Sequence, residues 1–125
     1  MAKKILIADD EENIRILIRK TLEFAGGDFE IYEARDGIEA IRMARKIKPN
    51  MMILDVMMPG MTGYEVCKIV KNSAETQDVY VMFLTARGGS ISKTTVDLCG
   101  GNEFITKPFD PEELGLRIKK ALGIP

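Results

Sequence analysis

The chain has 125 residues, of which 30% are charged and 46% hydrophobic, and its formal net charge is −1. This length fits a single domain over residues 1–125 that can bury a core without disulfide or metal support. The balanced charge argues against bulk binding to nucleic acid or to an anionic membrane surface. No apolar stretch reaches the roughly 20 residues of a membrane span, and the N-terminus lacks the apolar region of a signal peptide. We therefore expect a cytoplasmic protein.

Two cysteines, Cys67 and Cys99, lie far apart in the sequence and lack CxxC spacing. Buried free thiols in a reducing compartment are the main expectation, and a disulfide or a redox switch is the alternative.

The first half of the chain alternates strand and helix patterns. Residues 3–9 are an apolar strand, and residues 12–25 carry apolar side chains at the spacings of three and four that are typical of a helix. Residues 29–34 alternate apolar and polar side chains, as an edge strand does. Residues 38–47 predict a second helix, with Ile38 as the first member of its apolar pattern.

The second half continues the alternation. Residues 51–55 and 79–84 are wholly apolar, as central parallel strands covered on both faces are. Helices are predicted at 64–72 and 90–99, a short strand at 103–106, and a last helix begins after Asp110 with Pro111 at its first position. Strand and helix thus follow each other five times, which predicts an α/β fold with a parallel sheet and right-handed crossovers.

Polar side chains stand at the ends of four predicted strands, namely Asp9 and Asp10, Asp55, Thr85 and Lys107. Each taken alone could be a helix cap, a turn residue or a solvated lysine. Parallel strands, however, present their carboxyl ends at one edge of the sheet, where open α/β folds build their sites. We therefore expect these five side chains to converge.

Three carboxylates held together repel each other, and the pKa of at least one should rise. Lys107 offsets one charge and a divalent cation would offset the other two. The chain has no histidine, and carboxylate oxygens favour Mg²⁺ or Mn²⁺ over zinc. Asp55, at the end of a central strand, is placed to attack phosphorus and form an acyl phosphate. Lys107 and Thr85 could then each bind a phosphoryl oxygen.

The segments ILIADDEENIR, ILDVMMPGMTGYEV, VMFLTAR and FITKPFDPEEL resemble, in order and spacing, the receiver domain of two-component response regulators. The resemblance covers nearly the whole chain. It implies a flavodoxin-like (βα)5 three-layer sandwich whose five-stranded parallel sheet has the order 2-1-3-4-5.

The resemblance also assigns roles in a magnesium site. Asp55 would be the phosphoacceptor, and Asp10 and Asp55 would bind Mg²⁺ directly. The backbone carbonyl of Met57 would be a further ligand, and Asp9 would act mainly through water. Mn²⁺ could replace Mg²⁺ at such oxygen ligands.

A switch is implied as well. Thr85 and Lys107 would contact the phosphoryl group, and the Lys107–Pro108 peptide would be cis. On phosphorylation Thr85 would move towards the phosphoryl group and Phe104 would rotate inward. The surface of the fourth helix, the fifth strand and the fifth helix would then change and bind a downstream protein.

The resemblance also implies which classes of protein would bind this chain. A sensor histidine kinase or a phosphotransfer protein would donate the phosphoryl group, and the chain would lose it slowly by itself, as a signalling switch rather than an enzyme. We expect a monomer or a weak dimer that depends on phosphorylation, with no direct binding to nucleic acid or membrane. Because no output domain follows Pro125, we expect a stand-alone receiver unless the chain is part of a longer regulator.

Some positions depart from the family pattern. Thr62 stands where the family usually has Asp, which should affect loop capping more than chemistry. Met57 and Arg87 occupy positions that tune hydrolysis, and Met57 cannot orient an attacking water by hydrogen bonding, so we expect a persistent phosphorylated form. Residues 88–101 combine paired glycines with β-branched side chains, which predicts a short or mobile fourth helix.

Three alternatives fit less well. A phosphatase of the haloacid dehalogenase type would carry DxDxT after its first strand, whereas Asp55 ends the third and is followed by Val-Met-Met-Pro. A flavin carrier would need a phosphate-binding first loop, and the sequence DDEEN would repel phosphate in the absence of a metal. A degenerate receiver that serves only for docking would have lost acids of the cluster, and this chain keeps all of them.

Overall fold

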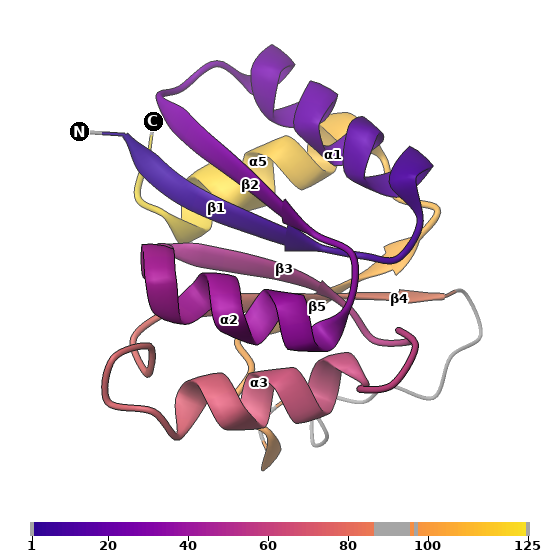
Figure 1. The fold of residues 1–125 in the computed structure, drawn as a ribbon. Coiled ribbons are helices and arrows are strands. Elements are labelled where there is room, and N and C mark those ends of the chain that lie inside the picture. The colour runs from indigo at the N-terminus through magenta and orange to yellow at the C-terminus, as the bar shows by residue number, and fades with distance from the viewer. Residues whose placement is uncertain (1, 87–95, 97, 125) are drawn as a thin grey trace.

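The computed structural model describes residues 2–86, 96 and 98–124. Its strands are β1 (Lys3–Ala8), β2 (Phe29–Ala34), β3 (Met51–Asp55), β4 (Tyr80–Ala86) and β5 (Glu103–Lys107), and its helices are α1 (Glu12–Ala25), α2 (Gly37–Ile47), α3 (Gly63–Lys71) and α5 (Pro111–Ala121) (Figure 1). Most of the predicted helix over 90–99, namely positions 90–95 and 97, lies outside the described residues, as does Arg87, so the predicted mobility of this helix and the role of Arg87 stay predictions. Across the part of the chain that is described, no helix has the length and apolarity needed to cross a membrane.

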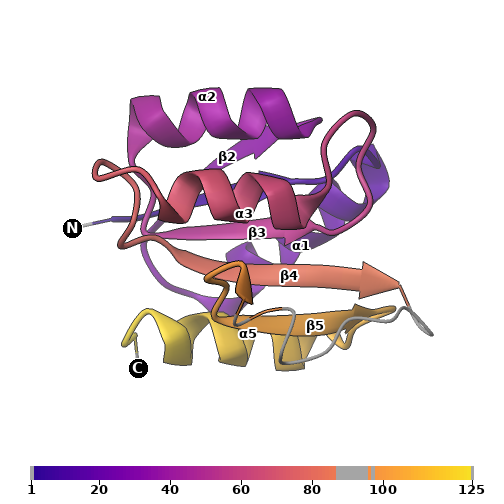
Figure 2. The same cartoon turned by 90° about the horizontal axis from the view of Figure 1, so that it is seen from below.

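The five strands form one parallel sheet in the order β2-β1-β3-β4-β5. Helices α2 and α3 cover one face of this sheet, and α1 and α5 cover the other, as Figures 1 and 2 show together. The edge position of β2 and the central position of β3 agree with the alternating and wholly apolar patterns of their sequences. The flavodoxin-like fold and its strand order are therefore confirmed.

Side chains of the strands alternate between two cores. Ile5 and Ile7 of β1 pack in the core under α1 and α5, whereas Leu6 and Ala8 pack in the core under α2 and α3. All four are fully buried. This alternation follows from the period of two residues in a strand, and it explains why central strands need apolar residues at every position.

Several predicted boundaries shift by one or two residues. Strands β4 and β5 extend to Ala86 and Lys107, so Thr85 and Lys107 lie inside strands rather than after them. Helix α2 begins at Gly37, one residue before the predicted start, and Ile38 is 60% exposed although it belongs to the apolar pattern of this helix. The helix instead buries small residues, Ala40 and Ala44 among them, which let it lie close to the sheet.

Candidate functional site

The carboxyl ends of the central strands bring the predicted site residues together. Asp55 of β3 pairs with Leu84, the residue directly before Thr85. Lys107 of β5 pairs with Ala86, the residue directly after Thr85. Three neighbouring strands therefore place an acid, a hydroxyl and an ammonium group side by side at one edge of the sheet.

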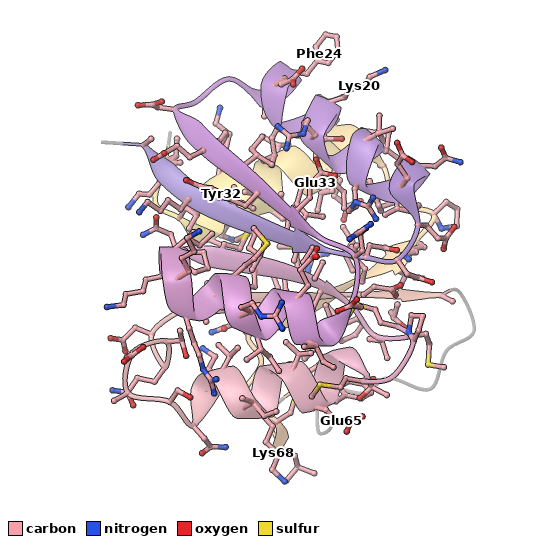
Figure 3. All side chains as sticks on the ribbon, in the orientation of Figure 1. Lys20, Phe24, Tyr32, Glu33, Glu65 and Lys68 are labelled. Atoms are coloured by element: carbon pink, nitrogen blue, oxygen red, sulfur yellow. The ribbon has the colours of Figure 1, made fainter. Side chains whose placement is uncertain are left out.

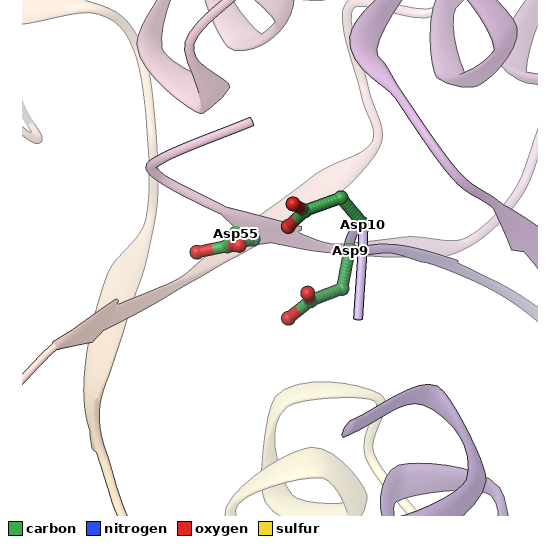
Figure 4. A group of neighbouring side chains, drawn as sticks. All are labelled: Asp9, Asp10 and Asp55. Carbon is green, nitrogen blue, oxygen red and sulfur yellow. The ribbon is translucent and has the colours of Figure 1, made fainter. Parts of the chain in front are cut away.

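Asp9 and Asp10 complete this edge from the end of β1. One carboxylate oxygen from each of Asp9, Asp10 and Asp55 lies within 4.8 Å of the others, and Figure 4 shows the three side chains converging from neighbouring strand ends. Asp9 is 0% exposed and Asp55 is 5% exposed, whereas Asp10 is exposed. Two negative charges are thus shielded from water, and the third faces solvent.

Lys107 provides the counter-charge inside the cluster. Its Nζ lies 2.9 Å from Asp9 Oδ2 and 3.4 Å from Asp55 Oδ1. Burial by itself would lower the pKa of Lys107, but the hydrogen bond and charge of Asp9, together with Asp55, raise it. Lys107 therefore stays protonated and neutralises one of the three carboxylates.

The surplus negative charge of the cluster disfavours ionisation of Asp55. Burial and the negative charge of Asp9 raise its pKa to about 6, although Lys107 and the Met57 N–H favour the ionised form. The Met57 N–H donates a hydrogen bond of 3.3 Å to Asp55 Oδ1. The expected rise in the pKa of one acid of the cluster is confirmed, and at neutral pH the ionised site has two uncompensated negative charges.

The ligand atoms available at this cluster fit a divalent cation that prefers oxygen ligands. Asp9, Asp10 and Asp55 offer only oxygen atoms, the chain contains no histidine, and the surplus charge beside Lys107 matches a doubly charged ion. The exposed side of Asp10 leaves room for the waters that Mg²⁺ retains. The residues present therefore fit Mg²⁺ or Mn²⁺.

The loop after Asp55 is folded tightly against the end of β3. The Gly63 N–H donates a 2.8 Å hydrogen bond to the Val56 carbonyl, and a Cβ on Gly63 would stand 2.5 Å from the Asp55 carbonyl oxygen. Thr62 caps α3, since its hydroxyl accepts from the Glu65 N–H and the Glu65 carboxylate accepts from the Thr62 N–H. Thr62 is therefore the N-cap of α3, a position that suits Thr, and the prediction that its departure from Asp affects capping more than chemistry stays a prediction.

The remaining predicted positions lie close to this edge. The Lys107–Pro108 peptide is cis, and the Met57 side chain is 72% exposed. Phe104 pairs with Phe83 of β4, is half-buried, and accepts a 3.1 Å hydrogen bond on its carbonyl from Arg117 Nη2. The structure thus places Phe104 on the strand that also delivers Lys107 to the site.

Arg15 contacts the site although it is absent from the sequence-based prediction. This nearly buried side chain on α1 donates a 2.7 Å hydrogen bond from Nη1 to the Asp9 carbonyl, and its Nε lies 3.0 Å from Glu33 of β2. Arg19 also binds Glu33, which Figure 3 labels. Burial raises the pKa of Glu33, but hydrogen bonds from Arg19 and Arg15 hold it below its usual value. The sequence does contain one sign of this role, because Arg15 is a charged residue that lies three positions before Ile18 and therefore on the apolar face of the helix.

The chain is similar in sequence to one protein family and to several bacterial regulators. The model of the response regulator receiver domain matches residues 5–119. The chain is 38% identical to the alkaline phosphatase synthesis transcriptional regulatory protein PhoP of Bacillus subtilis, over 98% of this chain and 49% of the relative. It is 38% identical to the phosphate regulon transcriptional regulatory protein PhoB of Klebsiella pneumoniae, over 98% of this chain and 52% of the relative. The chain spans about half the length of these relatives.

Solved structures agree with this assignment. The chemotaxis response regulator CheY4 of Vibrio cholerae is 31% identical with a TM-score of 0.87, covering 97% of this chain and 99% of that one. The BeF3-activated DrrB receiver domain is 28% identical with a TM-score of 0.79, covering 98% and 99%. Response regulators act in two-component phosphorelay signalling, where phosphorylation and Mg²⁺ are general features and the domain is a signalling switch. The chain belongs to the response regulator receiver domain family.

Proposed function

We propose that Asp55 accepts a phosphoryl group from a phosphohistidine of a sensor histidine kinase or a phosphotransfer protein. The observation that carries this proposal is the position of the Asp55 carboxylate, which is buried among Asp9, Asp10 and Lys107 at the carboxyl edge of the sheet. A carboxylate there combines a nucleophilic oxygen with an adjacent fixed positive charge.

Mg²⁺ would be held by the carboxylates of Asp10 and Asp55 and by the Met57 carbonyl, with Asp9 acting through water. A bound divalent cation would supply two positive charges, which offset the two surplus carboxylate charges, and it would polarise one phosphoryl oxygen. The same oxygen donors would accept Mn²⁺. This assignment is supported by the clustering of the three acids.

In the transfer itself, a carboxylate oxygen of Asp55 attacks phosphorus. The new O–P bond forms as the N–P bond to the donor histidine breaks, and the histidine nitrogen leaves with the electron pair. The Lys107 ammonium and the Thr85 hydroxyl would each contact one phosphoryl oxygen. Their contribution is positioning and charge stabilisation, which dominate phosphoryl transfer.

Movements of Thr85 and Phe104 would pass the change caused by phosphorylation to the partner-binding surface. Movement of the Thr85 hydroxyl towards the phosphoryl group, with rotation of Phe104, would change the surface around β5 and α5 and permit binding of a downstream protein. The half-buried state of Phe104 supports such a rotation. The Met57 side chain has no strong hydrogen-bonding group that could orient an attacking water, so the phosphorylated form should persist. The cytoplasmic location, the single-domain organisation and the absence of direct nucleic-acid binding remain predictions.

A docking module that works without phosphorylation is the other candidate. The complete acid cluster and the paired Lys107 argue against it, because a docking surface would not require buried charges that raise the pKa of Asp55.

The proposal is tested by incubating the protein with acetyl phosphate and Mg²⁺ and measuring its intact mass. The wild type should gain the mass of one phosphoryl group, and Asp55→Asn or chelation of the metal should abolish the gain. An equal gain in Asp55→Asn, or no gain in the wild type, would contradict the assignment of Asp55.

A further inference from the structure

The two cysteines, which are distant in the sequence, meet in the structure. Cys67 is fully buried on α3, and its Sγ donates a hydrogen bond of 3.3 Å to the Cys99 carbonyl oxygen. Cys99 is half-buried in the segment that leads into β5, and its Sγ lies 3.3 Å from the Val96 carbonyl oxygen. Both thiols are free.

The surroundings distinguish the two thiols. Burial and the neighbouring Cys99 thiol, which forms a side-chain hydrogen bond with Cys67, raise the pKa of Cys67 to about 12. Cys67 is therefore a poor nucleophile while the fold is closed, because the thiolate is the reactive form. Cys99 is more accessible, so an external reagent meets Cys99 first.

We propose that Cys67 and Cys99 form a reversible intramolecular disulfide, with a low-molecular-weight disulfide as the oxidant. The Cys99 thiolate attacks one sulfur of the oxidant, the S–S bond of the oxidant breaks, and one thiol leaves. The small ionised fraction of Cys67 then attacks the Cys99 sulfur and releases the second thiol, so this second step is the slow one. Two cysteine thiols lose two electrons and two protons, and the oxidant is reduced to two thiols.

The position of this bond gives it a consequence for the domain. It would tie α3 to the segment directly before β5 and close a loop that contains β4. Phe83 of β4 lies between these parts, since its ring packs edge-on against Tyr64 of α3 with centroids 5.3 Å apart. A Cβ on Gly101 would stand 2.4 Å from the same ring. The disulfide therefore restrains the packing around Phe83, the strand partner of Phe104.

The acid cluster lies outside this packing unit. Neither cysteine has a contact with Asp9, Asp55 or Lys107 among the hydrogen bonds and ion pairs of the described residues. Oxidation should therefore leave phosphoryl acceptance at Asp55 intact while it restrains the segment through which Phe104 responds. This second part rests on the proposed function, whereas formation of the disulfide does not.

Formation of the Cys67–Cys99 disulfide is tested by incubation with oxidised glutathione at mildly alkaline pH, followed by intact-mass measurement and alkylation. The wild type should lose the mass of two hydrogens, resist alkylation at both cysteines under denaturing conditions, and recover both thiols with dithiothreitol. Cys67→Ala should instead retain one glutathione on Cys99, and Cys99→Ala should stay unmodified while folded. A wild type that keeps glutathione on Cys99, forms only intermolecular disulfides or does not react would overturn the proposal.

The proposed restraint by the disulfide is tested by amide hydrogen exchange of residues 98–107, measured with and without beryllofluoride and Mg²⁺. The reduced protein should show a change in exchange on activation, and the oxidised protein should show a much smaller change. The intact-mass gain with acetyl phosphate should be the same for both forms. Equal exchange changes in the two forms would overturn the restraint. Failure of both forms to gain a phosphoryl group would refute the proposed function alone, since the disulfide has its own readout.

Discussion

The Lys107 ammonium donates a 2.9 Å hydrogen bond to Asp9, and the two residues are separated by 98 positions in the sequence. Asp9 is 0% exposed and the Lys107 side chain is 16% exposed, so the pair is largely removed from water. Lys107 also lies 3.4 Å from Asp55. One cation therefore stabilises two buried carboxylates that stand at the ends of different strands, and it connects the end of β1, the first strand in the chain, with β5, the last.

Replacement of Lys107 by Met should destabilise the metal-free protein. The change keeps the apolar stem but leaves Asp9 and Asp55 buried without a counter-charge, a situation that costs about 3 kcal/mol in other proteins. The free energy of unfolding at neutral pH, measured by urea denaturation with a chelator present, should fall by about this amount. Lys68, which is exposed on α3 and labelled in Figure 3, provides the control. A Lys68→Ala protein should unfold as the wild type does, and an equal loss in both variants would refute this role of Lys107.

The stability of the metal-free protein should depend on pH through Asp55. Because the pKa of Asp55 is raised from 3.8 to about 6 in the folded state, the folded state holds this proton more tightly than the unfolded chain. Ionisation of Asp55 therefore lowers stability progressively as pH rises from about 4 to above 6. Asp55→Asn removes this dependence.

The comparison is made by urea denaturation with a chelator across that pH range. Asp55→Asn should be more stable than the wild type at pH values above 6, and the advantage should shrink towards pH 4, where both side chains are neutral. An advantage that stays constant with pH would show that the substitution acts through something other than charge.

Mg²⁺ should stabilise the folded protein through the acid cluster. A ligand that binds only the folded state at 100 times its Kd adds about 2.7 kcal/mol to the free energy of unfolding. The melting temperature of the wild type should therefore rise with Mg²⁺, and Asp10→Asn should show a much smaller rise. Asp10 is exposed, so this substitution tests binding with little effect on folding. Asp28→Asn, an exposed acid before β2, should respond to Mg²⁺ as the wild type does, and a loss of response there would indicate nonspecific charge effects.

Arg15 should act as a positioning residue for Asp9. Its hydrogen bond to the Asp9 carbonyl fixes the backbone at the end of β1, and Glu33 holds the guanidinium in place. Arg15→Gln should weaken Mg²⁺ binding and slow phosphorylation by acetyl phosphate, and Arg15→Lys should restore only part of each, since Lys lacks the planar set of donors. Arg19 shares Glu33 and, among the described residues, forms no hydrogen bond with Asp9, so Arg19→Gln is the matched control. Equal Mg²⁺ affinity in Arg15→Gln and the wild type would rule out positioning.

Much of the fold was predictable because the apolar patterns are strong. The wholly apolar runs identified β3 and β4 as central strands, and their common direction placed Asp55 and Thr85 at the same edge. The predicted strand ends fell short in β4 and β5 because Thr85 and Lys107 are polar, and a pattern of apolar residues cannot distinguish a polar residue inside a strand from one after it.

Residues that depend on tertiary contacts were not predictable in this way. Arg15 appears in the sequence as an ordinary helix residue, and its role follows only from the approach of Glu33 and the Asp9 carbonyl. Ile38 follows the helical pattern and is nevertheless exposed, because α2 packs on the sheet through its alanines. The contact between Cys67 and Cys99 likewise requires the fold, since no spacing rule relates the two positions.

The assignment of Asp55 as the phosphoacceptor is tested most directly by chemical trapping. The protein is incubated with acetyl phosphate and Mg²⁺, treated with borohydride, which reduces an acyl phosphate to an alcohol, and digested for peptide mass analysis. Homoserine should form at position 55 alone, and only when Mg²⁺ and acetyl phosphate are both present. Homoserine at Asp9, Asp10 or another acid, with Asp55 unchanged, would contradict it.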